Sequence, residues 1–463
     1  MAVRERMIDV VDPAHGTVLG RVEEAGDDGA GAAVEAAAAA QRAWARTPPA
    51  GRGEALRAAA AALRDRARDV AMLQSRENGR PLHESLGGVM AGAGTLDEYG
   101  AMATMPRGRT LAGAWDATDF AAPEPRGVAA ALVPWNDPIA IACGPIGACL
   151  AAGNAIVVKP SEKTPLSTML LAEVLAAHLP DDVLRVVTGG PATGRALIAR
   201  PEVRLVLHTG SVATGREVAA ECGRRLVKAV LELGGKDPLI VDADVDPEWA
   251  AEQAATGAFA NAGQVCTSVE RIYVHRDVAG AFTAALAARA DALRPGDPLD
   301  PATTLGPLID EGQREVVEDH VGEAVALGAQ VLTGGGRLDG DGFFHQPTVL
   351  TGAGDGMRVM TDETFGPVAA VQVVDGFDEA LRRANAGEYG LAATVLTRSQ
   401  ANAQRAWREL QVGTVKINAV WGGAPGGSAE PRRGSGLGLG YGPGLLREVS
   451  SQKVVHMEPA PEG

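Results

Sequence analysis

Lysine is scarce in this chain of 463 residues. Lysine and arginine together number 43, and the only lysines are Lys159, Lys163, Lys228, Lys236, Lys416 and Lys453. Aspartate and glutamate number 58, so the formal net charge is −15, and no basic stripe runs along the chain. An acidic chain of this kind is a poor candidate for binding nucleic acid. We therefore expect no nucleic-acid partner.

Cysteine is also rare, which disfavours two common kinds of site. The cysteines are Cys143, Cys149, Cys222 and Cys266. They are too few for a disulfide framework, and no C-x-x-C pair suggests a zinc ribbon or a redox dithiol. The N-terminus, Met-Ala-Val-Arg-Glu-Arg, lacks the apolar core of a secretion signal. We expect a soluble protein of the cytoplasm, without a bound metal.

One long stretch is almost free of charge. Between residues 128 and 158 the only charged residue is Asp137, and the stretch is long enough to span a membrane. Prolines and asparagines interrupt it, however. The sequence therefore predicts two short buried strands joined by a helix, and no membrane span.

The rest of the chain reads as an α/β protein, because short apolar runs alternate with helical stretches. We expect an amphipathic helix over 54–73, ended by Asn78-Gly79, and further helices over 164–178 and 213–223. The expected buried strands cover 128–133, 155–158, 184–187, 205–207, 227–233, 271–275, 348–350, 368–374, 392–397 and 414–417. Residues 333–342 and 422–442 read as loops, and 453–457 as a lone edge strand that needs a partner.

The dinucleotide fingerprint G-x-G-x-x-G is absent, but another segment has the geometry of a phosphate site. Residues 208–215, His-Thr-Gly-Ser-Val-Ala-Thr-Gly, follow an apolar run and precede a helix. A glycine turn at a helix N-terminus binds phosphate through free backbone N–H groups. The alternative is a plain strand–helix turn.

Three side chains stand out as candidates for chemistry. Glu232 lies inside an apolar strand, where burial would raise its pKa and suit it to act as a general base, unless a lysine pairs with it. Cys266 lies in a small polar turn, which favours a nucleophile over a buried small hydrophobe. Asn136 lies between Pro134 and Pro138, where its amide is either a rigid donor or a cap for the next helix.

These segments together resemble the aldehyde dehydrogenase family. The resemblance runs from Asp12 nearly to the C-terminus, and Cys266 follows Glu232 by 34 residues, a spacing typical of the family. The motifs stand in the family's order: Pro134–Pro138, Lys159-Pro-Ser-Glu162, Thr209-Gly-Ser211, Leu231-Glu-Leu-Gly-Gly235, Gly263-Gln-Val-Cys266 and Glu363-Thr-Phe-Gly-Pro367.

The resemblance implies an aldehyde dehydrogenase-like α/β fold in three parts. A Rossmann-like NAD-binding domain would take 1–106 and 126–233, and an α/β catalytic domain would take 234–445. A small β element for oligomerisation would take 107–125 and 446–463. A homodimer or homotetramer is implied.

The resemblance also implies a mechanism. The Cys266 thiolate would attack the aldehyde, and the Asn136 amide with the Cys266 N–H would stabilise the oxyanion. Hydride transfer would leave a thioester, which a water activated by Glu232 would hydrolyse to the carboxylic acid. One alternative is a coenzyme A-acylating semialdehyde dehydrogenase, which Glu232 disfavours because thiol transfer needs no base. Another is a non-catalytic scaffold member of the family.

Cofactor residues carry over in the same way. Lys159 and Glu162 resemble the pair that hydrogen-bonds the adenosine ribose, and a carboxylate there repels a 2′-phosphate, so we predict NAD over NADP. The implied contacts to the rest of the cofactor involve Trp135, Gly210, Ser211, Gly215, Glu363 and Phe365.

Several departures from the family bear on the substrate. Asp137 stands where an aromatic residue is usual, His208 where phenylalanine is common, and Ser428-Ala-Glu-Pro431 replaces Pro-Phe-Gly-Gly. Gly423 and Ala429 stand at aromatic substrate-tunnel positions, which leaves Trp421. This predicts a wider, more polar tunnel that disfavours small apolar aldehydes. Asp137 and Trp421 could attract a cationic aldehyde, unless Asp137 caps the following helix or pairs with Arg432 or Arg433.

Overall fold

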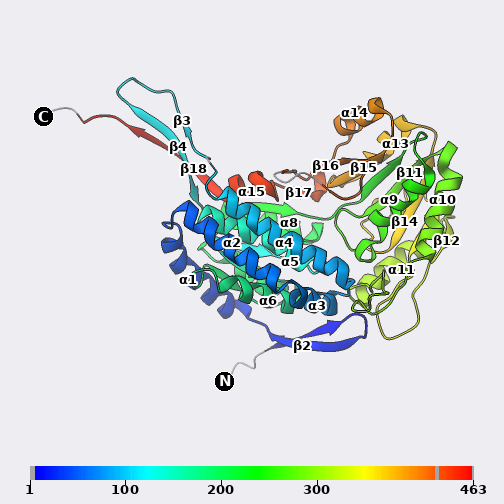
Figure 1. The fold of residues 1–463 in the computed structure, drawn as a ribbon, viewed down its shortest axis with the longest axis horizontal. Helices are drawn as coiled ribbons and strands as arrows, with labels where there is room; N and C mark the ends of the chain where they lie inside the picture. Colours follow the sequence, from blue (N-terminus) through cyan, green and yellow to red (C-terminus); the bar gives the residue numbers. More distant parts are fainter. Residues whose placement is uncertain (1–5, 106, 423–426, 461–463) are drawn as a thin grey trace.

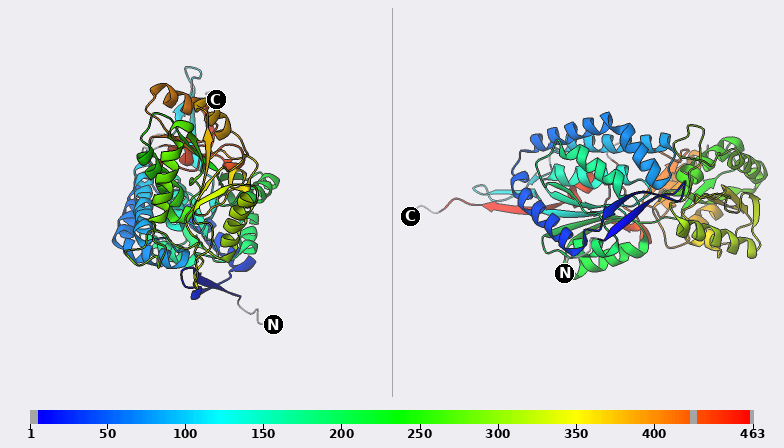
Figure 2. Two further views of the ribbon diagram at one scale, coloured as in Figure 1. Left: turned by 90° about the vertical axis from the view of Figure 1, so that its right-hand side faces the viewer. Right: turned by 90° about the horizontal axis from the view of Figure 1, so that it is seen from below.

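The computed structural model describes residues 6–105, 107–422 and 427–460. Two α/β bodies lie side by side, and a β arm projects from one of them (Figure 1). The right-hand view of Figure 2 shows the arm projecting from the end of the first body that lies opposite the second body. Gly423 lies outside the described residues, so its position in a substrate tunnel stays a prediction.

The first body is built on a six-stranded sheet in the order β17-β9-β8-β5-β6-β7. Its strands are β5 (Val128–Leu132), β6 (Ala155–Lys159), β7 (Leu184–Val186), β8 (Val203–Thr209) and β9 (Lys228–Glu232), all parallel, and the short antiparallel β17 (Gly436–Leu437). Residues 128 and 130 of β5 pack on one face and 129 and 131 on the other, as the period of a strand requires.

Helices cover both faces of this sheet. The helices are α1 (Gly26–Trp44), α7 (Pro191–Ala199) and α8 (Val212–Arg225) on one face, and α2 (Pro49–Asp65), α3 (Ala67–Asn78), α4 (Leu82–Met102), α5 (Pro138–Ala152) and α6 (Pro165–Ala176) on the other. The uncharged stretch forms β5, α5 and β6, as predicted. Across the described ranges no helix is both long and apolar enough to cross a bilayer.

The second body is built on a seven-stranded sheet in the order β12-β13-β14-β11-β10-β15-β16. Its strands are β10 (Asp237–Val241), β11 (Val269–His275), β12 (Gln330–Thr333), β13 (Thr348–Thr351), β14 (Val368–Val374), β15 (Ala392–Leu396) and β16 (Thr414–Ile417), and only β12 is antiparallel to its neighbour. Its helices are α9 (Pro247–Phe259), α10 (Arg276–Asp291), α11 (Glu311–Ala326), α12 (Arg358–Thr361), α13 (Phe377–Ala384) and α14 (Gln400–Glu409).

The remaining strands lie outside both sheets. The arm contains β3 (Arg109–Thr110), β4 (Thr118–Pro125) and β18 (Ser450–Met457), in the order β18-β4-β3. The hairpin of β1 (Met7–Asp12) and β2 (Thr17–Glu23) lies near the N-terminus. After the second body the chain returns to the first through β17 and α15 (Gly442–Glu448), before the arm strand β18.

Two local predictions need correction. The helix expected over 54–73 is two helices, α2 and α3, which break at Arg66. Leu63 of α2 and Val70 of α3 enter the same core, so the apolar stripe continues across the break and periodicity cannot reveal it. The edge strand expected over 453–457 starts earlier, at Ser450, and pairs with β4 along its whole length. Strands β1, β2, β10 and β12 were not predicted, and the short strand β17 lies within residues 422–442, which were expected to form a loop.

Candidate active site

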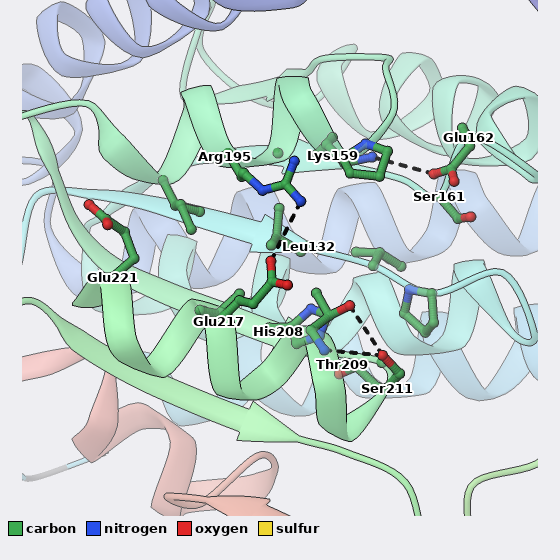
Figure 3. A pocket seen from close by; sticks show the side chains of 18 of the residues that line it. Leu132, Lys159, Ser161, Glu162, Arg195, His208, Thr209, Ser211, Glu217 and Glu221 are labelled. Carbon is green, nitrogen blue, oxygen red and sulfur yellow. Dashed lines mark hydrogen bonds and ion pairs between the residues drawn. The ribbon is translucent and has the colours of Figure 1, made fainter. Parts of the chain in front are cut away.

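The carboxyl ends of the parallel strands in the first body border a cavity of about 700 Å³. Figure 3 shows the side chains that line it. It brings together five predicted cofactor residues from three segments of the chain: Trp135, Lys159, Glu162, Gly210 and Ser211. Ligands bind in open α/β sheets at this end of the strands. The site therefore lies where the topology favours one.

The predicted phosphate turn lies on this cavity, at the N-terminus of α8. Ser211 is the N-cap, and its Oγ accepts a hydrogen bond from the Thr214 N–H at 3.2 Å. Gly215 packs beneath the turn, where a Cβ atom would overlap the Leu233 side chain. The backbone of α8 can thus lie close to β9, with the positive end of its dipole at the cavity.

Lys159 is held in place by backbone carbonyls. Its Nζ donates to Pro160 O at 2.7 Å and to Gly189 O at 2.6 Å, and lies 4.0 Å from Glu162 Oε2. Burial lowers the pKa of Lys159, although the charge of Glu162 opposes this. The Glu162 carboxylate is half-exposed at the cavity.

A second cavity of about 220 Å³ adjoins the first, and the two share Pro134, Trp135, Thr209, Gly210 and Ser211. Four further predicted site residues line it: Asn136, Cys266, Glu363 and Phe365. The Trp135 and Phe365 rings meet edge to face, with centroids 5.3 Å apart. The structure therefore brings the predicted nucleophile, oxyanion donor and nicotinamide contacts to one space.

The turn before Cys266 has unusual backbone geometry. Asn261 and Ala262 are left-handed, with φ of 49° and 54°, and Gly263 follows at 73°. A Cβ at residue 263 would overlap the Gly366 carbonyl, so the position requires glycine. This conformation lets α9 end and the chain enter the small cavity at Cys266.

Asn136 is tied to the same turn. Its Nδ2 donates to Gln264 O at 3.0 Å, and Asn261 Nδ2 donates to both Asn136 O and Gln264 O at 3.2 Å. The alternative that Asn136 caps a helix is wrong, because Asp137 occupies the N-cap of α5. The amide is thus held two residues from the nucleophile.

The thiol of Cys266 is neutral near pH 7. Burial raises the pKa of Cys266 to about 12, and the charges of Asp237, Glu232 and Glu363 add to this effect while Lys416 opposes it. A nucleophilic role therefore requires a group that accepts the thiol proton.

Glu232 ends β9 and lines neither cavity. Its carboxylate lies against Gly440, where a Cβ would overlap it. Burial raises the pKa of Glu232 to about 8, and the Gly440 N–H partly opposes the shift. The alternative that a lysine pairs with Glu232 is wrong, because the adjacent Lys228 and Lys236 pair with Glu448 and Glu270.

Glu363 is positioned by a buried network. Gly235 N donates to Glu363 Oε1 at 3.0 Å, and burial raises the pKa of Glu363 to about 8. Behind it, Glu270 accepts the Phe365 N–H at 3.0 Å and pairs with Lys236 Nζ at 2.5 Å. Sequence reasoning missed Glu270, although a carboxylate inside the apolar strand β11 was the same signal that singled out Glu232.

Asp137 and Trp421 line neither cavity. Asp137 is the N-cap of α5, but its side chain accepts no capping hydrogen bond there, and its ion-pair partner is Arg80, at 2.5 Å, rather than Arg432 or Arg433. Lys416 Nζ lies 5.2 Å above the Trp421 ring. Each group thus has a cationic partner from the protein already, which removes the basis for expecting a cationic aldehyde.

Comparison with known proteins covers nearly the whole chain. The family model described as "Aldehyde dehydrogenase family" matches residues 1–455. A solved structure of an E. coli NADP-dependent enzyme is 34% identical with a TM-score of 0.96, and covers 98% of this chain and 95% of its own. A solved structure of lactaldehyde dehydrogenase is 32% identical with a TM-score of 0.96, and the match covers 98% of this chain and 96% of that one. A solved structure of indole-3-acetaldehyde dehydrogenase complexed with NAD+ is 32% identical with a TM-score of 0.96, and the match covers 98% of this chain and 94% of that one.

Proposed function

The chain belongs to the aldehyde dehydrogenase family of oxidoreductases, and from this premise we propose that it oxidises an aldehyde to the carboxylic acid with NAD as acceptor. One observation carries the proposal. Asn136, Cys266, Glu363 and Phe365 line a single cavity that adjoins the larger cleft of the first body. A nucleophile, an amide donor and a dinucleotide-sized cleft are what the chemistry requires.

The large cleft fits a dinucleotide. Lys159 and Glu162 would hold the adenosine ribose, Ser211 and the Gly210–Gly215 turn the pyrophosphate, and Trp135, Glu363 and Phe365 the nicotinamide half. The bound nicotinamide ring supplies the hydride acceptor. We propose that 1–106 and 126–233, together with the returning β17 and α15, form this cofactor domain, and that the rest of 234–445 forms the catalytic domain.

The reaction begins at Cys266. Its thiol proton passes to a base while Sγ bonds to the carbonyl carbon of the aldehyde, which gives a thiohemiacetal oxyanion. Asn136 Nδ2, which donates to Gln264 O in the structure, donates to this oxyanion together with the Cys266 N–H. Loss of hydride from the same carbon leaves a thioester on Cys266.

Glu232 completes the reaction. Its carboxylate turns from Gly440 toward the thioester and takes a proton from water, whose oxygen bonds to the acyl carbon while the C–S bond breaks. The carboxylic acid leaves, and the proton held by Glu232 passes to the sulfur, which regenerates the Cys266 thiol and the Glu232 carboxylate. A carboxylate with a pKa of about 8 suits this role, because it is a stronger base than an ordinary glutamate.

The preference for NAD rests on Glu162. Its half-exposed carboxylate faces the cleft beside Lys159, where it would repel a 2′-phosphate. We expect kcat/KM to be higher with NAD than with NADP. Glu162→Gln should reduce the ratio of kcat/KM with NAD to kcat/KM with NADP at least tenfold. A wild type that uses NADP as well as NAD, or better, would overturn the preference.

An aldehyde panel monitored at 340 nm tests the function. Wild type should form NADH with at least one aldehyde and Cys266→Ala with none, while Cys266→Ala still binds NADH. We expect polar aldehydes to be preferred over small apolar ones. A flat trace for every aldehyde with both cofactors would support the scaffold alternative, and acyl-coenzyme A formation on adding coenzyme A would support the acylating one.

A further inference from the structure

His208 is a buried polar side chain in the wall of the 700 Å³ cavity. It is the penultimate residue of β8, is 7% exposed, and lines the cavity with Lys159 and Ser211 (Figure 3). Residue 207 faces the opposite side of the sheet and enters the core beneath the helices that cover that face. The alternation of the strand therefore turns His208 toward the cleft.

Both ring nitrogens of His208 lack a hydrogen-bond partner within the described part of the chain. The Leu132 carbonyl is near enough to favour the protonated ring, but does not form a hydrogen bond of acceptable geometry. The other buried histidines each have a partner for one ring nitrogen: His320 Nδ1 meets Thr364 Oγ1 at 3.1 Å, and His345 Nδ1 meets Gln346 O at 2.7 Å, although His345 Nε2 has none. Buried polar groups are normally satisfied, so His208 calls for a partner from outside the chain.

The ring lies between two expected parts of the cofactor site. A Cβ on Gly210 would lie 2.7 Å from His208 Cε1 and 2.9 Å from Nε2, so the imidazole touches the phosphate turn. Burial lowers the pKa of His208 to about 4, and the nearby charge of Lys159 adds to the effect. The ring is thus neutral at pH 7 and offers one N–H donor and one acceptor nitrogen.

We propose that His208 is a cofactor-binding residue whose ring N–H donates to an oxygen of the adenosine diphosphate half of the dinucleotide. The inference rests on the proposed function, since it assigns a ligand to the same cleft. Ribose hydroxyls and phosphate oxygens are the acceptors that this half presents between the Lys159 and Ser211 sites. A neutral donor adds affinity there without favouring an additional phosphate group.

Binding measurements without aldehyde test the proposal. His208→Phe keeps an aromatic ring of similar size and removes both nitrogens. Its dissociation constants for NADH and ADP-ribose, measured by calorimetry, should rise about five- to tenfold, as expected for one lost hydrogen bond. Nicotinamide mononucleotide should bind as to the wild type. His345→Phe removes a buried histidine that lines neither cavity and should leave all three constants unchanged.

Two conservative variants identify the donor atom. The amide nitrogen of His208→Gln approximates the position of Nε2, and that of His208→Asn approximates Nδ1. One of the two should bind ADP-ribose more tightly than His208→Phe does. These variants also keep the test open if the phenylalanine variant does not fold.

Thermal unfolding separates binding from a structural role. Removing an unsatisfied buried donor should raise the Tm of the ligand-free His208→Phe protein, while the increase in Tm produced by NADH becomes smaller. Binding of ADP-ribose within twofold of wild type would overturn the proposal, as would an equal loss of nicotinamide mononucleotide binding. A wild type that binds neither NADH nor NADPH would instead refute the proposed function.

Discussion

Arg80 Nη1 lies 2.5 Å from Asp137 Oδ2, and this ion pair is part of a network between two segments that border the small cavity. The Arg80 Nε atom lies 3.3 Å from Glu84 Oε2, which in turn accepts the Asn261 N–H at 3.0 Å. Burial alone would lower the pKa of Arg80, but the two carboxylates raise it above its usual value. The network therefore runs from the residue after Asn136 to the turn that carries Cys266.

Because Arg80 balances Asp137, we expect Asp137→Asn to leave the order of preference among amino, neutral and acidic aldehydes unchanged. Arg80→Met should lower kcat about tenfold, since Asn136 and Cys266 lose their common support. It should also lower the free energy of unfolding by roughly 1–3 kcal/mol, because a mostly buried carboxylate is left unpaired. Initial rates across the aldehyde panel and urea unfolding measure both effects.

The control for Arg80 is Arg76→Met, since Arg76 is half-exposed and lies 3.9 Å from its partner Asp12. The double variant Arg80→Met/Asp137→Asn should lower the free energy of unfolding by less than the sum of the two single variants, because the two residues are in contact. Strict additivity, or a change in the aldehyde ranking with Asp137→Asn, would contradict the network.

Glu232 predicts a pH dependence of turnover. Its folded pKa of about 8 lies above the ordinary value for glutamate, so the basic carboxylate is a minority species at pH 7 and predominates above pH 8. Thioester hydrolysis should accelerate as pH rises through 8 and then level off. Glu232→Gln should lower kcat by about 10²–10⁴-fold and remove the increase in hydrolysis rate between pH 7 and pH 8. Stopped-flow absorbance should show a burst of NADH followed by almost no turnover.

Glu363→Gln is the comparison for that experiment, because Glu363 has a similarly raised pKa but a different expected role. We expect it to raise KM for NAD without an acyl-enzyme burst. If Glu232→Gln retains the wild-type pH profile, another group acts as the base.

Two glycines of α8 provide a matched pair. Gly215→Ala should destabilise the protein by roughly 1–3 kcal/mol and weaken NADH binding, because the new Cβ overlaps Leu233 and displaces the helix start. Gly223→Ala has no atom within 4 Å of the new Cβ and should stabilise the helix by up to about 1 kcal/mol. Chemical unfolding and NADH titration measure both. Equal effects at the two positions would refute this account of the phosphate turn.

We propose that β18 joins subunits. Among the described strands its only neighbour is β4, so its other edge is open, and the side chains of Val454 and Met457 in this strand are 67% and 50% exposed. Wild type should elute as a dimer or tetramer in size-exclusion chromatography with light scattering. Val454→Asp/Met457→Asp should reduce that mass. Trp407→Asp alters a 53% exposed residue of α14 and should not change it. A monomeric wild type would refute the role.

Local patterns predicted the strands well where burial is complete. Residues 155–158 and 392–397 correspond to the fully buried strands β6 and β15, as expected, because almost uninterrupted apolar runs have few alternatives in an α/β protein. β10 was missed because it begins with Asp237 and Pro238, two residues that are uncommon in strands. Its pairing with the neighbouring strands β11 and β15 stabilises it. The break at Arg66 was missed for a similar reason, because both helices use one core.

The six lysines show that the sequence gives the position of a charged residue but not its partner. Their scarcity, and the concentration of four of them between 159 and 236, could be read directly from the chain. Their partners could not, because they come from distant segments: Lys163 pairs with Asp310, Lys228 with Glu448 and Lys453 with Glu124. Lys416 instead lies over Trp421.

The sequence by itself determined the α/β class and the family resemblance, and it singled out Cys266, Asn136 and Glu232 as candidates for the chemistry, because residue type and order along the chain carry that information. Only the tertiary structure decided that Asp137 is balanced by Arg80, that Glu232 lies against Gly440, and that His208 lacks a partner. Ionisation and hydrogen bonding depend on which groups exclude water from one another, and folding brings those groups together from distant positions in the chain.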